Sequence, residues 1–278
     1  MEVNRLLKKS GFVFKKRYGQ NFITDANLLR AIVSDAEVCG ADTVVEVGAG
    51  AGALTKELAA RAKKVVAFEI DTTLKPVLDS ALSGLNNVQI FYRDLLKVSP
   101  GELAAIVGGP YKVVANLPYY ITTPVIFYFL DDPHCRSMVL TVQREVAERI
   151  TAAAGAPEYG AMTAQLNVKS DVTVTRHISR RMFTPRPNVD SAVARIDVRP
   201  KFDTAAFGPT LKKLIAAGFA MRRKTLVNNI VVAFALDRPT AEQALTAAKI
   251  DPLARGEVLT AADYVRLASV LASAEFKN

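Results

Sequence analysis

Residues 43–52 read TVVEVGAGAG. The first half is a mostly apolar run typical of a buried strand, and three glycines follow at alternate positions. Glycine lets the backbone turn sharply and approach a ligand closely where a helix begins. The next segment is such a helix, because Leu54 and Leu58 are spaced to lie on one of its faces. This strand–turn–helix pattern is typical of the opening of a nucleotide-binding α/β unit.

Two further predicted strands end at acidic residues. Residues 65–68 lead directly into Glu69, and residues 88–92 are followed, after one arginine, by Asp94. Glu69 stands about 20 residues beyond Gly48, which is the spacing expected for a carboxylate that receives the hydroxyls of a ribose. Glycines combined with a strand-end acid favour a nucleoside site over a purely structural turn.

A fourth predicted strand, residues 113–115, leads into the tetrapeptide Asn116-Leu117-Pro118-Tyr119. Ligands of open α/β sheets bind outside the carboxyl ends of the strands, which is where this tetrapeptide falls. Pro118 holds Leu117 extended, so carbonyl oxygens here can point outward, while Asn116 offers a side-chain acceptor and Tyr119 a flat apolar face. These groups suit the exocyclic amine of a planar base. A turn that merely ends the strand is the alternative.

The remaining patterns divide the chain into two domains. Further strands are expected at 138–142, 172–175 and 192–198, and helical patterns cover 144–153 and 161–169. We therefore predict an α/β fold over residues 1–200, a Rossmann-like domain with a mostly parallel seven-stranded sheet. A small all-α domain is expected over residues 204–278 because only helical patterns follow Pro200.

Capping signals mark two helices of the second domain. We expect one helix to be capped by Thr240 with Gln243, and the last helix to be capped by Thr260 with Asp263.

The charge of the chain favours a polyanionic partner. It contains 36 Lys and Arg against 27 Asp and Glu, a formal charge of +9. Basic residues cluster in residues 1–20, where aromatics are interleaved with them, in the stretch Arg176–Pro187 and at 222–224. Nucleic acid is the leading candidate; a solvated, basic terminus is the alternative for the first cluster.

Other compositional features exclude several classes of protein. Cys39 and Cys135 form no Cys-x-x-Cys pair, and His134 and His177 are the only histidines, so neither a disulfide framework nor a zinc site is indicated. The first residues lack the apolar core of a secretory signal, and no apolar run of ~18 residues suggests a membrane span. We expect a cytoplasmic protein without a metal.

Three functions fit these features. The pattern Gly48-x-Gly50-x-x-Ala53 would also serve an NAD-linked oxidoreductase. Against this alternative, no substrate-polarising His or Lys follows a predicted strand end. S-adenosylmethionine needs the same glycine turn and ribose acid without a pyrophosphate site, so a methyltransferase is favoured. A non-catalytic RNA-binding factor in ribosome assembly is the third possibility.

Taken together, the motifs of the chain resemble those of a known family, the small-subunit ribosomal RNA adenine dimethyltransferases. The resemblance covers nearly the whole chain. Gly19 and Leu117 favour this family over the related enzymes of macrolide resistance, whereas Ile23 and Met221 depart slightly from its usual pattern. The motifs that carry the resemblance are Gly19-Gln20-Asn21-Phe22, Glu46-Val47-Gly48-Ala49-Gly50, Glu69, Asp94, Asn116-Leu117-Pro118-Tyr119, Phe183-Thr184-Pro185-Arg186-Pro187, Val189-Asp190-Ser191-Ala192 and Arg222-Arg223-Lys224-Thr225-Leu226.

The resemblance implies a role for each matching residue. Phe183 would stack on the target adenine opposite Tyr119; a core aromatic is the alternative for Phe183. The implied catalytic residues are Asn116, Leu117, Pro118, Tyr119 and Phe183. The implied cofactor-binding residues are Asn21 and Ile23 from the N-terminal arm, Gly48 and Gly50 at the methionine end, Glu69 at the ribose, Asp94 at the adenine amine, and Asn116 between cofactor and substrate.

The resemblance also implies a reaction. Methyl groups from S-adenosylmethionine would be transferred to the N6 amines of two adjacent adenosines in a loop near the 3′ end of small-subunit (16S) rRNA, giving N6,N6-dimethyladenosine. The implied partners are this rRNA and the immature small subunit, with no membrane, and the implied state is a monomer that acts in small-subunit biogenesis. Reaching the amine requires an unstacked base, and we infer no side-chain general base.

Overall fold

A computed structural model describes residues 12, 14–15, 18–221 and 223–273. The chain forms two compact units. The first contains residues up to Ala147 together with Thr173–Val198, and the second contains Glu148–Val172 together with the chain from Arg199 onward. In the described ranges, no helix combines the length and the apolar character that crossing a membrane requires.

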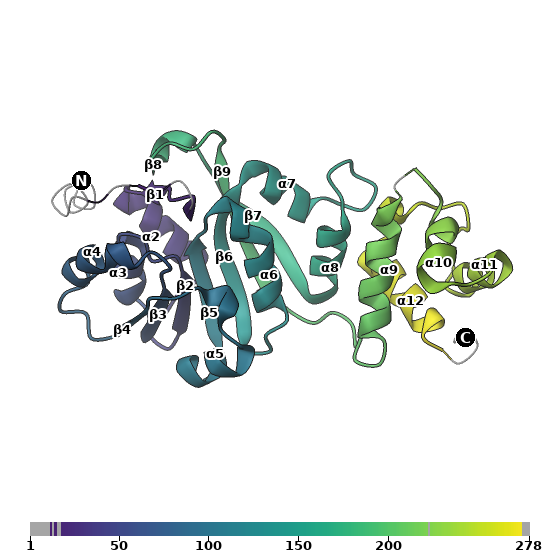
Figure 1. The fold of residues 1–278 in the computed structure, drawn as a ribbon, viewed down its shortest axis with the longest axis horizontal. Coiled ribbons are helices and arrows are strands. Elements are labelled where there is room, and N and C mark those ends of the chain that lie inside the picture. The colour runs from purple at the N-terminus through teal and green to yellow at the C-terminus, as the bar shows by residue number, and fades with distance from the viewer. Residues whose placement is uncertain (1–11, 13, 16–17, 222, 274–278) are drawn as a thin grey trace. The chain divides into compact units, whose positions relative to one another are not determined.

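The first unit is built on a seven-stranded sheet in the order β4-β3-β2-β5-β6-β9-β7 (Figure 1). The five strands from β4 to β6 run parallel, and β9 is antiparallel to β6. The predicted fold, a Rossmann-like and mostly parallel seven-stranded sheet, is confirmed. The strands are β2 (Thr43–Val47), β3 (Lys64–Phe68), β4 (Val88–Phe91), β5 (Tyr111–Asn116), β6 (Cys135–Gln143), β7 (Ser170–Ile178) and β9 (Ser191–Val198).

The strand order reverses between β2 and β5. The chain passes from β2 outward to β3 and β4, then returns to place β5 on the other side of β2, with Val45 opposite Val113. Neighbouring helices leave the two strands on opposite faces at such a reversal, which opens a crevice at the carboxyl edge. The glycine turn after β2 and the tetrapeptide after β5 therefore lie at the same crevice.

Two helices pack with their apolar side chains against one face of the sheet. Ile32 and Val33 of α2 and Leu58 of α3 are fully buried against strand residues such as Val44 and Val114. Each such side chain contributes about 1.5–3 kcal/mol relative to an exposed position. The helices of the first unit are α2 (Ala26–Asp35), α3 (Ala53–Ala59), α4 (Lys75–Ala81), α5 (Pro100–Val107), α6 (Thr122–Leu130) and the first part of α7 (Arg144–Thr151).

Several strands extend beyond their apolar runs. The run 138–142 predicted the centre of β6, but the strand covers Cys135–Gln143 because it pairs with β5 on one side and β9 on the other. Strand β7 likewise covers Ser170–Ile178, whereas the sequence predicted 172–175. Backbone hydrogen bonds continue the ladder through polar positions that hydropathy does not register.

The second unit is helical and includes a segment that the predicted boundary had assigned to the first domain. Tyr159, Ala164 and Val168 are buried in one cluster with Leu214 and Tyr264, so residues 148–172 pack with the later helices. The predicted division near 200–204 is thus corrected for this earlier segment. The helices are α8 (Ala161–Lys169), α9 (Gly208–Ala220), α10 (Leu226–Phe234), α11 (Arg238–Ala247) and α12 (Ala261–Leu271).

One of the two predicted caps in this unit is wrong. Helix α11 begins at Arg238 with Asp237 as its N-cap, whose carboxylate accepts from the Thr240 N–H at 2.8 Å. Pro239 in the first turn suits this earlier start because its missing N–H needs no partner there. Thr260 and Asp263 do form a complete capping box at the start of α12.

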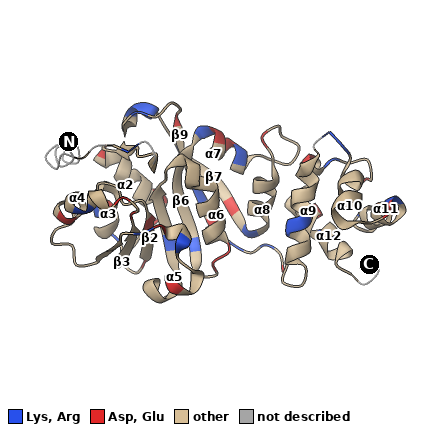
Figure 2. Ribbon diagram, viewed as in Figure 1, with Lys and Arg blue, Asp and Glu red and all other residues tan. Residues whose placement is uncertain are grey.

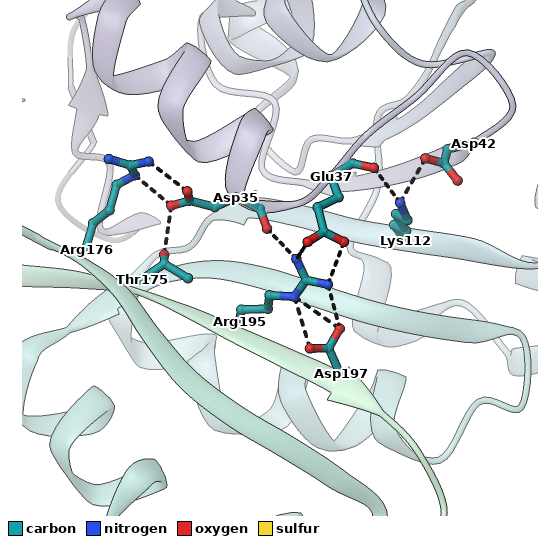
Figure 3. A network of polar contacts seen from close by, with 8 residues as sticks. All are labelled: Asp35, Glu37, Asp42, Lys112, Thr175, Arg176, Arg195 and Asp197. Atoms are coloured by element: carbon teal, nitrogen blue, oxygen red, sulfur yellow. Dashed lines mark hydrogen bonds and ion pairs between the residues drawn. The ribbon is translucent and has the colours of Figure 1, made fainter.

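A polar network ties the end of α2 to β9 and β7 (Figure 3). Arg195 on β9 donates to the backbone carbonyl of Asp35 at 2.9 Å and pairs with the carboxylates of Asp197 and Glu37. Arg176 on β7 donates to the two carboxylate oxygens of Asp35 at 2.6 and 2.7 Å. The carboxylates raise the pKa of Arg195 above its usual value. The network fixes the first described helix to the sheet.

Arg195→Met should lower the free energy of unfolding by about 1–3 kcal/mol, because the half-buried Asp197 carboxylate and the Asp35 carbonyl lose a charged donor. Urea denaturation measures this change. Lys75→Met is the matched control, since it removes an ion pair with Asp79 in which both side chains are 58% exposed. The control should leave the unfolding midpoint nearly unchanged; equal effects of the two variants would contradict a structural role for the network.

Candidate active site

A cavity of about 160 Å³ lies at the carboxyl edge of the sheet, around the crevice between β2 and β5. Its walls come from five parts of the first unit, which are far apart in the sequence. They are residues 18–23, the turn 46–51 with the start of α3, residues 68–70 after β3, residues 93–96 after β4, and residues 116–118 and 120–121 after β5; Leu29 of α2 and Val125 of α6 complete the lining.

The glycine turn allows the cavity to approach the backbone closely. Gly48 adopts φ +79° and its N–H donates to the Phe68 carbonyl at 2.8 Å, which holds the turn against the end of β3. A side chain at Gly50 would place a Cβ only 3.0 Å from the Phe22 ring. Gly48 therefore favours glycine through its positive φ alone, whereas Gly50, with φ +57°, favours it through both its φ and the space beside Phe22.

Glu69 is 5% exposed and lies in the cavity wall. Its Oε2 accepts from the Gly50 N–H at 2.8 Å, and its Oε1 accepts from the Asp71 N–H at 2.8 Å. Burial raises the pKa of Glu69, and these two donors act against that shift. Each carboxylate oxygen has a further lone pair, so Glu69 is held rigidly while it retains acceptor capacity for ligand hydroxyls.

Asp94 and Asn116 line the same cavity from neighbouring loops. Asp94 Oδ1 accepts from the Leu96 N–H at 3.0 Å, which fixes the carboxylate at the start of a short 3-10 turn. Asn116 Nδ2 donates to the Asn21 carbonyl at 2.8 Å. Because that carbonyl can only accept, the bond orients the Asn116 amide and leaves its Oδ1 as an acceptor.

The rest of the tetrapeptide is divided between the cavity and the region beside it. Leu117 and Pro118 line the cavity, and Pro118 keeps the backbone extended at φ −57°, ψ 130°. Tyr119 is not among the lining residues, and its hydroxyl lies 2.8 Å from Ser191 Oγ at the start of β9. Burial raises the Tyr119 pKa. Next to it, Tyr120 lines the cavity and is 60% exposed.

Phe183 lies in the core of the first unit. Its ring is 4% exposed and belongs to the core cluster with Ile23 and Ile178. Its backbone pairs with Ile23 in the short antiparallel sheet of β1 (Phe22–Ile23) and β8 (Phe183–Thr184). This position agrees with the alternative of a core aromatic, and stacking of Phe183 on the target adenine stays a prediction.

Glu46 is a cavity residue to which the sequence had assigned no role. It is 1% exposed, and no oxygen of its carboxyl group has a hydrogen-bond partner in the described part of the chain. Burial raises the pKa of Glu46 to about 8; the nearby Thr55 hydroxyl opposes this shift, and the negative charge of Glu69 adds to it. An acid within the apolar run TVVEV is the signal that could have identified it. Tyr18 and Gln20 also line the cavity without having been predicted.

The structure describes only part of the predicted basic clusters. Arg5, Lys8, Lys9, Lys16, Arg17 and Arg222 lie outside the described residues. Lys15 pairs with Asp71 at 2.6 Å, so this cation is engaged within the protein. Arg180 and Arg181 form an exposed basic turn before β8 (Figure 2), and Arg223 and Lys224 are exposed in the second unit.

Comparisons with known proteins agree with this geometry. The family described as "Ribosomal RNA adenine dimethylase" matches residues 11–273. The chain is 41% identical over 274 residues to "Ribosomal RNA small subunit methyltransferase A" of Bacillus mycoides, covering 96% of this chain and 94% of that protein. Relatives of the same name in Bacillus cereus and Bacillus anthracis reach the same identity and coverage.

This chain belongs to the ribosomal RNA adenine dimethylase family.

Two solved structures show the same fold as this family member. The 23S rRNA methyltransferase ErmE has a TM-score of 0.71 and 27% identity, covering 91% of this chain and 100% of its own. A dimethyladenosine transferase from Plasmodium falciparum has a TM-score of 0.72 and 25% identity, covering 88% of this chain and 95% of its own. As a ribosomal RNA adenine dimethylase the protein is a methyltransferase, which sets aside the oxidoreductase and the non-catalytic RNA-binding factor.

Glu46→Gln should change how stability depends on pH. The folded protein keeps the Glu46 proton up to about pH 8, whereas the unfolded chain releases it near the ordinary value of 4.5. The folded state therefore binds more protons between these values, and this group destabilises the fold as pH rises through the window. Glutamine cannot titrate, so the variant should gain free energy of unfolding relative to wild type on going from about pH 5 to 8.

Urea denaturation at several pH values measures this difference. Asp79→Asn on the exposed face of α4 is the control and should follow wild type across the window. A constant difference between Glu46→Gln and wild type would contradict the protonated state of Glu46.

Proposed function

We propose that the protein transfers methyl groups from S-adenosylmethionine to the N6 amines of two adjacent adenosines in a loop near the 3′ end of small-subunit rRNA, giving N6,N6-dimethyladenosine. One observation carries the proposal: the acids Glu69 and Asp94 and the acceptors of Asn116-Leu117-Pro118 line one cavity at the sheet's switch point. The relatives' name, a methyltransferase of the small ribosomal subunit, supports the choice of RNA.

The cavity residues fit S-adenosylmethionine. Glu69 would accept from the ribose hydroxyls, and Asp94 would accept from the adenine amine. Ile23 gives an apolar wall, and Gly48 lets the backbone reach the methionine end without a side chain in the way. Glu46 adds a buried carboxyl group without a partner among the described residues, which suits a ligand that carries positive charge.

The chain's own contribution to the reaction is to hold the acceptor amine. The cofactor supplies an electrophilic methyl group on a sulfonium centre. The lone pair of an adenine N6 is delocalised into the ring, so the protein must bind the amine through its N–H groups and orient it. Asn116 Oδ1 and the Leu117 carbonyl would accept these two hydrogen bonds, and Pro118 keeps the carbonyl turned outward.

The arrangement needs no side-chain base. The N6 proton becomes acidic only after the amine has gained the methyl group, so solvent can accept it. After one transfer a single N–H remains, and the amine can rotate to offer this hydrogen to one of the two acceptors. Two methyl transfers to the same nitrogen are then compatible with one set of residues.

The RNA partner is proposed from charge and exposure. The first unit presents Arg180 and Arg181, and the helical unit presents Arg223 and Lys224 as candidates for phosphate contacts. We further propose that the helical unit is an RNA-binding domain, that the substrate is an immature small subunit, and that the protein acts as a cytoplasmic monomer in subunit biogenesis. The overall charge of +9 supports such a polyanionic partner.

Glu69→Ala should weaken binding of S-adenosylmethionine, because two hydroxyl bonds to a charged acceptor are lost, each about 1.5–3 kcal/mol before water compensates. Isothermal titration calorimetry measures the affinity. Asp79→Ala, an acid outside the cavity wall, should bind like wild type. Unchanged affinity of Glu69→Ala would remove Glu69 from the cofactor site.

Asn116→Ala should abolish methyl transfer while the protein remains folded and cofactor affinity falls only modestly. The reason is geometric, since one of the two acceptors that hold the amine is lost. Wild type and variant are incubated with immature small subunits, and digested rRNA is examined by mass spectrometry. Dimethyladenosine from wild type and none from the variant are expected; monomethyl product alone, or normal activity of the variant, would refute this assignment.

A further inference from the structure

Asp71 lies just outside the cavity wall, two residues after Glu69, and is 1% exposed. Its carboxylate binds side chains from the N-terminal part of the chain. Lys15 Nζ donates to Oδ1 at 2.6 Å and Gln20 Nε2 donates to Oδ2 at 2.9 Å. The Lys15 N–H also donates to Gln20 Oε1 at 3.0 Å, so the two donors are joined to each other as well as to Asp71.

One wall of the cavity comes from the N-terminal part of the chain. Residues 18–23, called the 18–23 segment below, all line it. The segment is also held by the bond from Asn116 Nδ2 to the Asn21 carbonyl at 2.8 Å. Next to Asn21, the Phe22 ring packs against the Gly50 turn. The segment is thus attached to Asp71 through Gln20 and to Asn116 through Asn21.

The backbone of Asp71 is hydrogen-bonded to Glu69, the acid that we propose binds the ribose. Its N–H donates to Glu69 Oε1 at 2.8 Å, while its Oδ1 also accepts from the N–H and the hydroxyl of Thr73 at 3.1 and 2.6 Å. The bonds from Thr73 therefore hold the Asp71 carboxylate in place independently of Lys15 and Gln20. A buried, charge-assisted pair of this kind is stronger than an exposed one.

We propose that Asp71 is a positioning residue that fastens the 18–23 segment across the cavity and so controls how fast the cofactor leaves. The inference rests on the proposed function, in which S-adenosylmethionine occupies this cavity. Asp71 does not touch the ligand. A ligand enclosed by the segment can dissociate only when the segment opens, and opening breaks the bonds from Lys15 and Gln20 to Asp71.

The test compares Asp71→Asn and Lys15→Met with the control Asp79→Asn, which changes an exposed pair on the adjacent helix. Asparagine can still cap the turn at Thr73, so the fold is retained, and Lys15→Met removes the same contact from the other side. Rapid-dilution measurements with radiolabelled S-adenosylmethionine should give dissociation at least about fivefold faster in both variants, because affinity changes within one site fall mainly on the dissociation rate.

Two further measurements separate positioning from a general loss of structure. The KM for S-adenosylmethionine should rise in both variants while kcat for rRNA methylation stays within about twofold of wild type, since the acceptors of the amine are untouched. The double variant should dissociate little faster than Asp71→Asn alone, because that variant already lacks the carboxylate to which both Lys15 and Gln20 donate. Equal dissociation rates in wild type and both variants, or a fall in kcat alone, would overturn the proposal.

Limited trypsin digestion without any ligand tests the fastening independently of the cofactor. Cleavage after Lys15 should be faster in Asp71→Asn than in wild type or Asp79→Asn, because the lysine loses its carboxylate partner. If wild type binds no S-adenosylmethionine, the proposed function fails while this digestion still reports on the contact. If wild type binds it and digestion rates are equal, the proposed function stands and the role of Asp71 is overturned.

Discussion

The site depends on the parallel pairing of β2 with β5 at the point where the strand order reverses. This pairing brings the carboxyl ends of two strands that are over 60 residues apart to the same edge, one followed by glycines and the other by Asn116-Leu117-Pro118-Tyr119. The adjacent strands β3 and β4 add Glu69 and Asp94 at that edge. Fully buried valines on both faces of the sheet keep the register from slipping, since a shift of one residue would turn the apolar set outward.

Two buried acids at this edge differ in their hydrogen bonds. Glu69 receives backbone N–H donors from Gly50 and Asp71, which hold it in one orientation. Glu46 receives no hydrogen bond within the described residues, and burial keeps it protonated up to about pH 8. A carboxylate that is already held by N–H donors can accept a further hydrogen bond from a neutral group such as a hydroxyl. A buried carboxyl group without a partner is stabilised most by a ligand that brings hydrogen-bond donors or positive charge. This difference supports the proposal that the cavity binds a cationic nucleoside.

The 18–23 segment completes the cavity through contacts that have little regular structure. Strand β1 is only two residues long, and the segment is held by side-chain bonds to Asp71 and by the bond from Asn116 to Asn21. Few backbone bonds have to break for such a segment to move, which is the property expected of an element that opens and closes. The opening that we propose for the 18–23 segment would therefore break few backbone hydrogen bonds.

The sequence by itself determined the sheet and the strand-end residues. Apolar runs located all seven strands, and the acids and glycines that follow them were placed correctly at the cavity because a parallel sheet aligns its carboxyl ends. Only the tertiary structure decided which face each side chain meets. Phe183 became a core residue by pairing with Ile23, residues 148–172 joined the helical unit, and Lys15 found Asp71, which is 56 residues away. Local periodicity reports whether a residue is buried, but the identity of its neighbours depends on packing between segments that the sequence does not order in space.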